Sequence, residues 1–243
     1  VTFEPLILIC DMSSILLKNI NCNGILSDIC IEGTRIKKIV PVGGCSGGHI
    51  EIASGVEVMD CEGKTAMPAF INMHTHAAMS LMRGIEEDVQ LHEWLDKIWK
   101  TEARIDEEFV YWGTKVACLE MIKTGTVTFN DQYWYSLTAR KAAVEMGLRP
   151  VVSYVALDHN DHEETERQKE QIQEVYEKSL ALKDNGIFET AIHAIYSTSE
   201  ELMLWVTEFA RKHGLKIHIH ISETEKEVAD CKELHGGLSP VEY

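Results

Sequence analysis

The chain has 243 residues and a formal net charge of −16, from 23 basic and 39 acidic residues. This balance disfavours nucleic acid and anionic membrane surfaces as partners, because phosphate groups are bound by clustered lysine and arginine. Apolar residues make up 45% of the chain, but no apolar run reaches the roughly 18 residues that a membrane helix needs. We therefore expect a globular protein whose partner is a small molecule, and a homo-oligomer remains open.

Short apolar or alternating stretches fill the first part of the chain. They are separated by turn pairs such as Asn23-Gly24 and Glu32-Gly33, and this pattern predicts a small antiparallel β unit. The expected strands are residues 15–20, 25–31, 35–42 and 50–59. These strands are too few for the unit to close on itself.

After Pro68 the pattern changes to a strand followed by a helix, five times over. The expected strands are residues 70–74, 126–130, 150–157, 188–196 and 216–222. Each is a nearly continuous apolar run, as expected for parallel strands covered on both faces. The order predicts a parallel sheet, either doubly wound or forming five of the eight strands of a (β/α)₈ barrel.

Three helices have recognisable sequence features. Asp106 and Gly125 predict the start and end of one helix, and Thr198 with Glu201 forms a capping box for another that ends at Gly214. The acidic stretch 161–184 predicts a solvated helix. We expect its inward face to carry Ile172, Val175, Tyr176 and Leu180.

The seven cysteines include no CxxC pair, and several lie inside apolar runs. Cysteine in such surroundings behaves as a small hydrophobic residue. The pattern favours reduced thiols in a cytoplasmic protein.

Two histidine pairs lie at the ends of the first and fifth predicted strands. Alternate strand residues point to the same face and lie roughly 7 Å apart, so His74 and His76 can hold one metal ion. His220 is the expected ligand of the second pair, whereas His218 points the same way from deeper in the strand and is expected to be a hydrogen-bonded interior residue. Imidazole suits zinc, iron and nickel, and no nearby cysteine indicates a thiolate site.

Three protein ligands would leave a position for water, whose pKa a bound metal lowers toward 7. Glu223 lies three residues past His220, where it could pass protons to a substrate nitrogen. Its alternative role is to cap, or lie in the first turn of, the helix that begins near Thr224. Other candidates are Asp131 after the second strand, Asp158 and His159 after the third, and His193 within the fourth.

Residues 67–84, MPAFINMHTHAAMSLMRG, closely resemble the first-strand motif of the amidohydrolase superfamily, in its subgroup of 5-methylthioadenosine/S-adenosylhomocysteine deaminases and chlorotriazine hydrolases. Later motifs of the same subgroup are resembled, in order, by residues 93–95, 101–104, 193–196 and 220–224. The resemblance covers nearly everything from Ile15 onward.

This resemblance implies an α/β fold, in which residues 66–243 form strands 1 to 5 of a (β/α)₈ TIM barrel and residues 1–65 an incomplete β-sandwich portion. It implies one divalent metal ion, zinc or else iron, with His74, His76 and His220 as ligands and Glu223 as the proton shuttle. It also implies that Glu102 binds ribose hydroxyls and that His193 contacts the substrate. Without it, Glu102 reads as a surface carboxylate, and His193 fits the core and the site equally well.

The chain departs from the family pattern in two ways. Some members place a substrate-binding arginine on the third strand, where this chain has Tyr154. The family's histidine on the sixth strand and metal-binding aspartate on the eighth strand have no counterpart before Tyr243. We therefore expect a truncated chain that continues in the full-length protein, and an inactive fragment.

The motif set favours a metal-dependent enzyme that hydrolytically deaminates an adenine nucleoside of the 5′-methylthioadenosine or S-adenosylhomocysteine type. One alternative is deamination or dechlorination of a heterocycle without ribose, such as guanine, a pterin or a triazine. The other is an inactive truncated homologue with a structural or interaction role.

Overall fold

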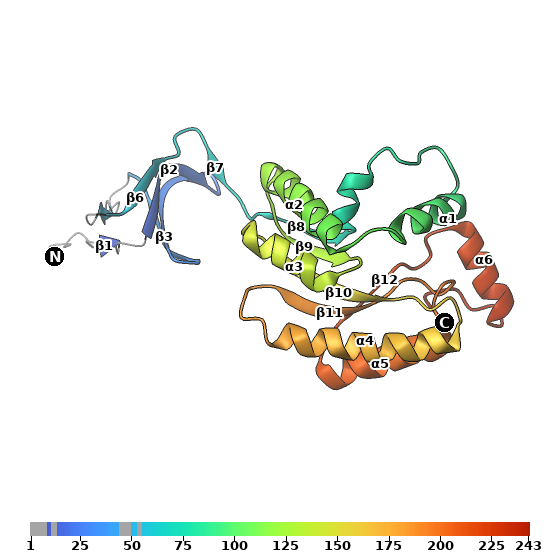
Figure 1. Ribbon diagram of the computed structural model, residues 1–243. Coiled ribbons are helices and arrows are strands. Elements are labelled where there is room, and N and C mark those ends of the chain that lie inside the picture. Colours follow the sequence, from blue (N-terminus) through green and yellow to red (C-terminus); the bar gives the residue numbers. More distant parts are fainter. Residues whose placement is uncertain (1–8, 11–13, 44–49, 53–54) are drawn as a thin grey trace. The chain divides into compact units, whose positions relative to one another are not determined.

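The computed structural model describes residues 9–10, 14–43, 50–52 and 55–243, and the chain forms two compact units, Val1–Pro68 and Ala69–Tyr243 (Figure 1). Each unit has its own sheet. Among the described residues, every helix is too short or too polar to cross a bilayer.

The first unit contains a mixed sheet in the order β4-β3-β2-β6, with β7 also paired to β2. Its strands are β2 (Ser14–Cys22), β3 (Ile25–Glu32), β4 (Arg35–Pro41), β6 (Glu57–Asp60) and β7 (Thr65–Ala66). The pairs β2–β3 and β3–β4 are antiparallel as predicted, but β6 and β7 run parallel to β2.

The strand expected at 50–59 is divided. Its first part is β5 (Glu51–Ile52), which pairs in parallel with β1 (Ile9–Cys10), and its second part is β6; residues 53–54 lie outside the described residues. Cys22 and Cys61 are free thiols, but Cys30 is disulfide-bonded. The prediction of reduced thiols is therefore wrong for Cys30.

The second unit is built on a five-stranded parallel sheet in the order β12-β11-β10-β9-β8. These strands are β8 (Phe70–Thr75), β9 (Thr126–Gln132), β10 (Arg149–Ala156), β11 (Ile187–Ile192) and β12 (Ile217–Ile219). Because consecutive strands are neighbours throughout, the unit forms five of the eight strands of a (β/α)₈ barrel, as predicted.

Helices follow the strands (Figure 1). They are the 3₁₀ helix η1 (Ala77–Met82), α1 (Leu91–Glu102), α2 (Glu107–Thr124), α3 (Ser136–Glu145), α4 (His162–Leu180), α5 (Glu200–His213) and α6 (Glu225–Leu234). Of these, α2, α3, α4 and α5 pack against the sheet. The fully buried Phe129 and Val152 belong to two of the clusters that join sheet and helices.

The predicted ends of α2 are confirmed. The Asp106 side chain accepts a hydrogen bond from the Phe109 N–H, and Gly125 ends the helix in the left-handed conformation. The predicted capping box of α5 is wrong by one residue, because Ser199 is the cap and accepts from the Leu202 N–H. The Thr198 hydroxyl instead donates to the Ala156 carbonyl.

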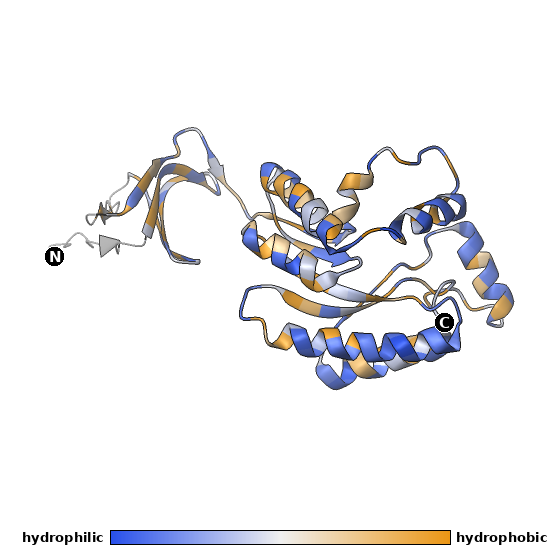
Figure 2. Cartoon of the chain, in the orientation of Figure 1, coloured by the Kyte–Doolittle hydropathy of each residue, from blue (hydrophilic) through white to orange (hydrophobic). Residues whose placement is uncertain are grey.

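Helix α4 is largely hydrophilic in Figure 2, as its charge pattern predicted. Ile172 is buried, and Val175 and Tyr176 pack on the core. Leu180 is 65% exposed, so its predicted inward position is wrong. It is the last residue of the helix and lies about 80° around the axis from Ile172, at about 100° per residue.

Candidate functional site

The carboxyl ends of the parallel strands bring the two histidine pairs together. His74 lies in β8, His76 follows it, and His218 and His220 lie in and just after β12. One ring nitrogen from each of His74, His76 and His220 lies within 4.8 Å of the others. Three residues from opposite edges of the described sheet therefore form one cluster.

The hydrogen bonds that His76 and His220 make through Nδ1 fix the tautomer of each ring. Nδ1 of His76 lies 2.6 Å from the Gln132 carbonyl oxygen, and Nδ1 of His220 lies 2.9 Å from the His193 carbonyl oxygen. A carbonyl oxygen only accepts, so each Nδ1 carries the proton and each neutral ring keeps a lone pair on Nε2. This arrangement is typical of metal-binding histidines.

The cluster also favours neutral imidazoles. Burial, with smaller contributions from neighbouring histidines, outweighs the Gln132 hydrogen bond and lowers the pKa of His76 to about 4. Burial and the adjacent His220 lower the pKa of His74. Neutral imidazole is the form that binds metal, so this donor set fits a divalent cation at neutral pH.

A second group, His162, Glu166 and Glu201, is close enough to share an ion, but all three residues are exposed. Lys169 already pairs with both carboxylates at 2.6 Å. The strand-end cluster is the better candidate, because backbone carbonyl oxygens hold two of its three ligands, His76 and His220.

His193 lies beside the cluster. Its ring centroid is 5.2 Å from that of His220, and its Nδ1 lies 2.7 Å from the Ser197 hydroxyl oxygen. Burial, with a smaller effect of nearby histidines, lowers its pKa to about 3. The residue pattern left open whether His193 is a core residue or a site residue, and this position favours a site residue.

Glu223 lies on the loop between β12 and α6 and is exposed. Thr224, not Glu223, caps α6, since its side chain accepts from the Glu227 N–H at 3.1 Å. Burial, together with the nearby carboxylates of Glu223 and Glu227, raises the pKa of Tyr196 to about 12. The carboxylate of Glu223 is therefore free of the capping role and faces the loop after β11.

Glu102 is the last residue of α1, and it is not a surface carboxylate. Its Oε2 accepts a hydrogen bond from the Trp134 indole N–H at 3.2 Å. Burial raises the pKa of Glu102, although hydrogen bonds from Tyr133 and Trp134 oppose the shift. A small cavity of about 60 Å³ is lined by Glu102 together with His76 and His193. This cavity joins the predicted ribose-binding residue to the histidine cluster.

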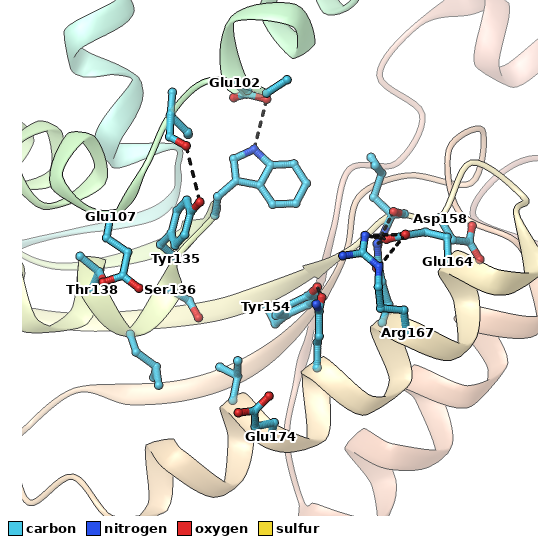
Figure 3. A pocket seen from close by; sticks show the side chains of 18 of the residues that line it. Glu102, Glu107, Tyr135, Ser136, Thr138, Tyr154, Asp158, Glu164, Arg167 and Glu174 are labelled. Carbon is cyan, nitrogen blue, oxygen red and sulfur yellow. Dashed lines mark hydrogen bonds and ion pairs between the residues drawn. The ribbon is translucent and has the colours of Figure 1, made fainter.

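A larger cavity of about 1020 Å³ begins at Glu102 and extends to α4 (Figure 3). Trp134 lines its near side, and Tyr154 and Arg167 line its far side. Arg167 Nε donates to Glu164 Oε2 at 2.9 Å. The residue pattern missed both Trp134 and Arg167. The aromatic run 133–135, directly after a strand, was the available signal for Trp134.

Two other strand-end candidates have structural roles. Asp131 is buried and accepts from the Ala77 N–H at 2.7 Å, which fixes the segment after His76. Burial raises its pKa to about 7. Asp158 accepts from the Ser199 N–H and the Thr165 hydroxyl and so joins the starts of α4 and α5. His159 contacts Trp99 and lines the larger cavity.

Comparisons with known proteins agree with this architecture. A family model described as "Amidohydrolase family" matches residues 65–242. A "5'-deoxyadenosine deaminase" of Methanocaldococcus jannaschii is 41% identical over 94% of this chain and 53% of its own length. A "5-methylthioadenosine/S-adenosylhomocysteine deaminase 1" of Archaeoglobus fulgidus is 40% identical over 86% of this chain and 47% of its own length. The chain thus spans about half the length of the curated relatives it matches.

Among solved structures, an adenosine deaminase from Xanthomonas campestris with bound zinc has a TM-score of 0.80. It is 23% identical, and the match covers 97% of this chain and 54% of that one. At this identity the match supports the fold.

Proposed function

Because this chain belongs to the amidohydrolase family, we propose that the full-length protein hydrolytically deaminates an adenine nucleoside modified at the 5′ position. The products are the corresponding inosine derivative and ammonia. The observation that carries this proposal is the small cavity that Glu102, His193 and His76 share beside the three-histidine cluster. The two curated relatives, named as deaminases of such nucleosides, support the choice of substrate.

His74, His76 and His220 would hold one divalent metal ion. The lone pairs on Nε2 of His76 and His220 and the closeness of the three rings support this assignment. When bound, the ion would supply Lewis acidity and activate water. Zinc is the ion we favour, since the solved relative binds it, and iron is the alternative.

The remaining residues would act on the nucleoside and on protons. The Glu102 carboxylate would accept hydrogen bonds from the ribose hydroxyls, with Trp134 fixing its orientation. His193 would contact the purine beside the histidine cluster. Glu223 would take a proton from the attacking water and deliver it to the ring nitrogen next to C6, so that addition at C6 leaves no charge on the ring.

The larger cavity supports a substrate with a 5′ substituent. It starts at Glu102 and continues toward Tyr154 and Arg167, and its volume of about 1020 Å³ exceeds what a ribose alone would fill. A free heterocycle would leave this space unused. This difference favours the nucleoside over guanine, a pterin or a triazine.

The experiment is ammonia release by the full-length protein from a substrate panel. We expect 5′-deoxyadenosine, 5′-methylthioadenosine or S-adenosylhomocysteine to have the highest kcat/KM, and adenine, guanine and chlorotriazines to have much lower values. A preference for a compound without ribose would favour the first alternative. Absence of activity together with absence of bound metal would favour an inactive homologue.

A cytoplasmic location and the oligomeric state stay predictions.

A further inference from the structure

The Nδ1 atoms of the three clustered histidines have unequal partners. Those of His76 and His220 face backbone carbonyl oxygens, which can only accept. Nδ1 of His74 instead lies 2.7 Å from Nε2 of His218, and the two rings are nearly perpendicular, at 89°. An imidazole nitrogen can donate or accept, so this contact alone does not fix the proton position on His74.

Only one of the two proton arrangements leaves His74 able to bind a metal. If Nε2 of His218 donates, Nδ1 of His74 accepts, and the His74 proton sits on Nε2, which faces Nε2 of His220 at 3.2 Å. If Nε2 of His218 accepts, His74 carries its proton on Nδ1 and its Nε2 lone pair faces the cluster. The second arrangement gives all three rings the same tautomer.

We propose that His218 is a positioning residue for metal binding, which accepts the Nδ1 proton of His74 and so holds His74 in the tautomer with a free Nε2. This inference rests on the proposed metal site and extends it by one residue. The arrangement places the proton of His218 on its own Nδ1. That atom is buried and has no hydrogen-bond partner among the described residues.

The unpartnered Nδ1 has a consequence for the whole site. A buried donor or acceptor without a partner costs about 1–3 kcal/mol, so Nδ1 of His218 carries this cost in either tautomer, and metal binding through Nε2 of His74 is what selects between them. No net proton is released when the pair changes tautomer. In the metal-bound site both His74 and His218 therefore carry their protons on Nδ1.

The test uses four variants of the full-length protein. In His218→Gln, the side-chain oxygen can reach the position of Nε2 and accept from His74, whereas His218→Asn ends near the position of Nδ1. His218→Leu fills the space without an acceptor, and His92→Leu, an exposed position on α1, is the matched control. Zinc affinity is measured by competition with a chromophoric chelator, and thermal unfolding of the metal-free proteins reports on packing.

We expect His218→Asn and His218→Leu to bind zinc about 10- to 100-fold more weakly, as is typical when a residue supporting a ligand is lost. We expect His218→Gln to stay within a few-fold of the wild type. If His218 only fills space, His218→Leu should bind zinc more tightly than His218→Gln, and this result would overturn the proposal. If His218→Leu does not fold, the zinc affinities of His218→Gln and His218→Asn still test the proposal. Equal affinities of these two variants would overturn it.

A second readout is the ¹⁵N NMR spectrum of the zinc-loaded wild-type protein. We expect both His74 and His218 to carry their protons on Nδ1, and a proton on Nε2 of His218 would overturn the proposal. A wild-type protein that binds zinc while all variants bind it equally would leave the proposed function intact and remove only the role of His218. A wild-type protein that binds no divalent metal would count against the proposed function itself.

Discussion

The buried carboxylate of Glu227 accepts a hydrogen bond from the backbone N–H of Glu223, at 2.7 Å. Its other oxygen accepts from the Ser222 N–H at 2.9 Å, and Ser222 has a positive φ of 57°. One side chain from the first turn of α6 thus holds the loop that carries the proposed proton shuttle.

We predict that Glu227→Ala lowers kcat of the full-length enzyme and leaves zinc affinity nearly unchanged. The loss leaves the Ser222 and Glu223 backbone N–H groups without their acceptor and frees the loop to move Glu223. Steady-state kinetics and chelator competition measure the two effects. Glu225→Ala, an exposed position in the same turn, is the control; a similar loss of kcat there would contradict the prediction.

Glu223→Gln tests the shuttle itself. The amide keeps the size of the side chain but cannot take a proton from water, so kcat should fall by about 10²–10⁴-fold. Metal content and the free energy of unfolding should stay at wild-type values, because Glu223 is exposed and does not cap α6. A variant that keeps most of its kcat would remove Glu223 from the mechanism.

Glu102→Gln should raise KM for a nucleoside more than it changes kcat. The amide oxygen can still accept from Trp134, while the charge offered to the ribose hydroxyls is lost. A hydrogen bond to a charged group contributes about 1.5–3 kcal/mol, which corresponds to roughly 10- to 150-fold in kcat/KM at 1.4 kcal/mol per tenfold.

The matched control for Glu102 is Glu108→Gln, since Glu108 is exposed on α2 and lines neither cavity. Its kinetic constants should be unchanged. Equal effects of the two substitutions would indicate a general loss of negative charge and would argue against ribose binding by Glu102.

Sequence reasoning succeeded where the relevant property is local. The alternation of a strand put His74 and His76 on one face, and Asp106 and Gly125 act within their own helix turns. Sequence reasoning failed where a contact with a residue far along the chain determines the environment of a side chain. Glu102 is half-buried, and Trp134, 32 residues away, donates a hydrogen bond to its carboxylate.

The start of α5 shows the same limit. The Thr198 hydroxyl is used by the Ala156 carbonyl, 42 residues away, and Asp158 binds the Ser199 backbone. The capping position therefore moves one residue along the chain, to Ser199. A capping pattern gives the type of element reliably, but tertiary hydrogen bonds set its first residue.

Asp131 predicts an unusual pH dependence of stability. Its carboxyl has a pKa of about 7 in the folded protein, from burial, against 3.8 as the ordinary value. Between these values the folded state holds a proton that the unfolded chain releases, so this group's contribution to the free energy of unfolding falls as pH rises from about 4 to 7.

Asp131→Asn keeps an acceptor for the Ala77 N–H and removes the titration. Urea unfolding of the metal-free wild-type and variant proteins, at pH 5 and pH 7.5, measures the effect. The variant should gain stability relative to the wild type at the higher pH. An unchanged difference between the two proteins at both pH values would contradict the prediction.

Gly113 on α2 tests whether the segment after His76 supports the metal site. A Cβ atom at this position would lie 2.4 Å from the Ala78 carbonyl oxygen in η1, so Gly113→Ala must push η1 away from α2. Such overpacking costs about 1–3 kcal/mol, and the shift would pass to His76, two residues before Ala78. We therefore expect both a lower free energy of unfolding and weaker zinc binding.

Gly147→Ala is the control for Gly113→Ala. The positive φ of 83° at Gly147 makes a side chain costly, by about 1–2 kcal/mol, but open space surrounds the position. It should lower stability while zinc affinity stays unchanged, and equal affinity in both variants would show that η1 does not position His76.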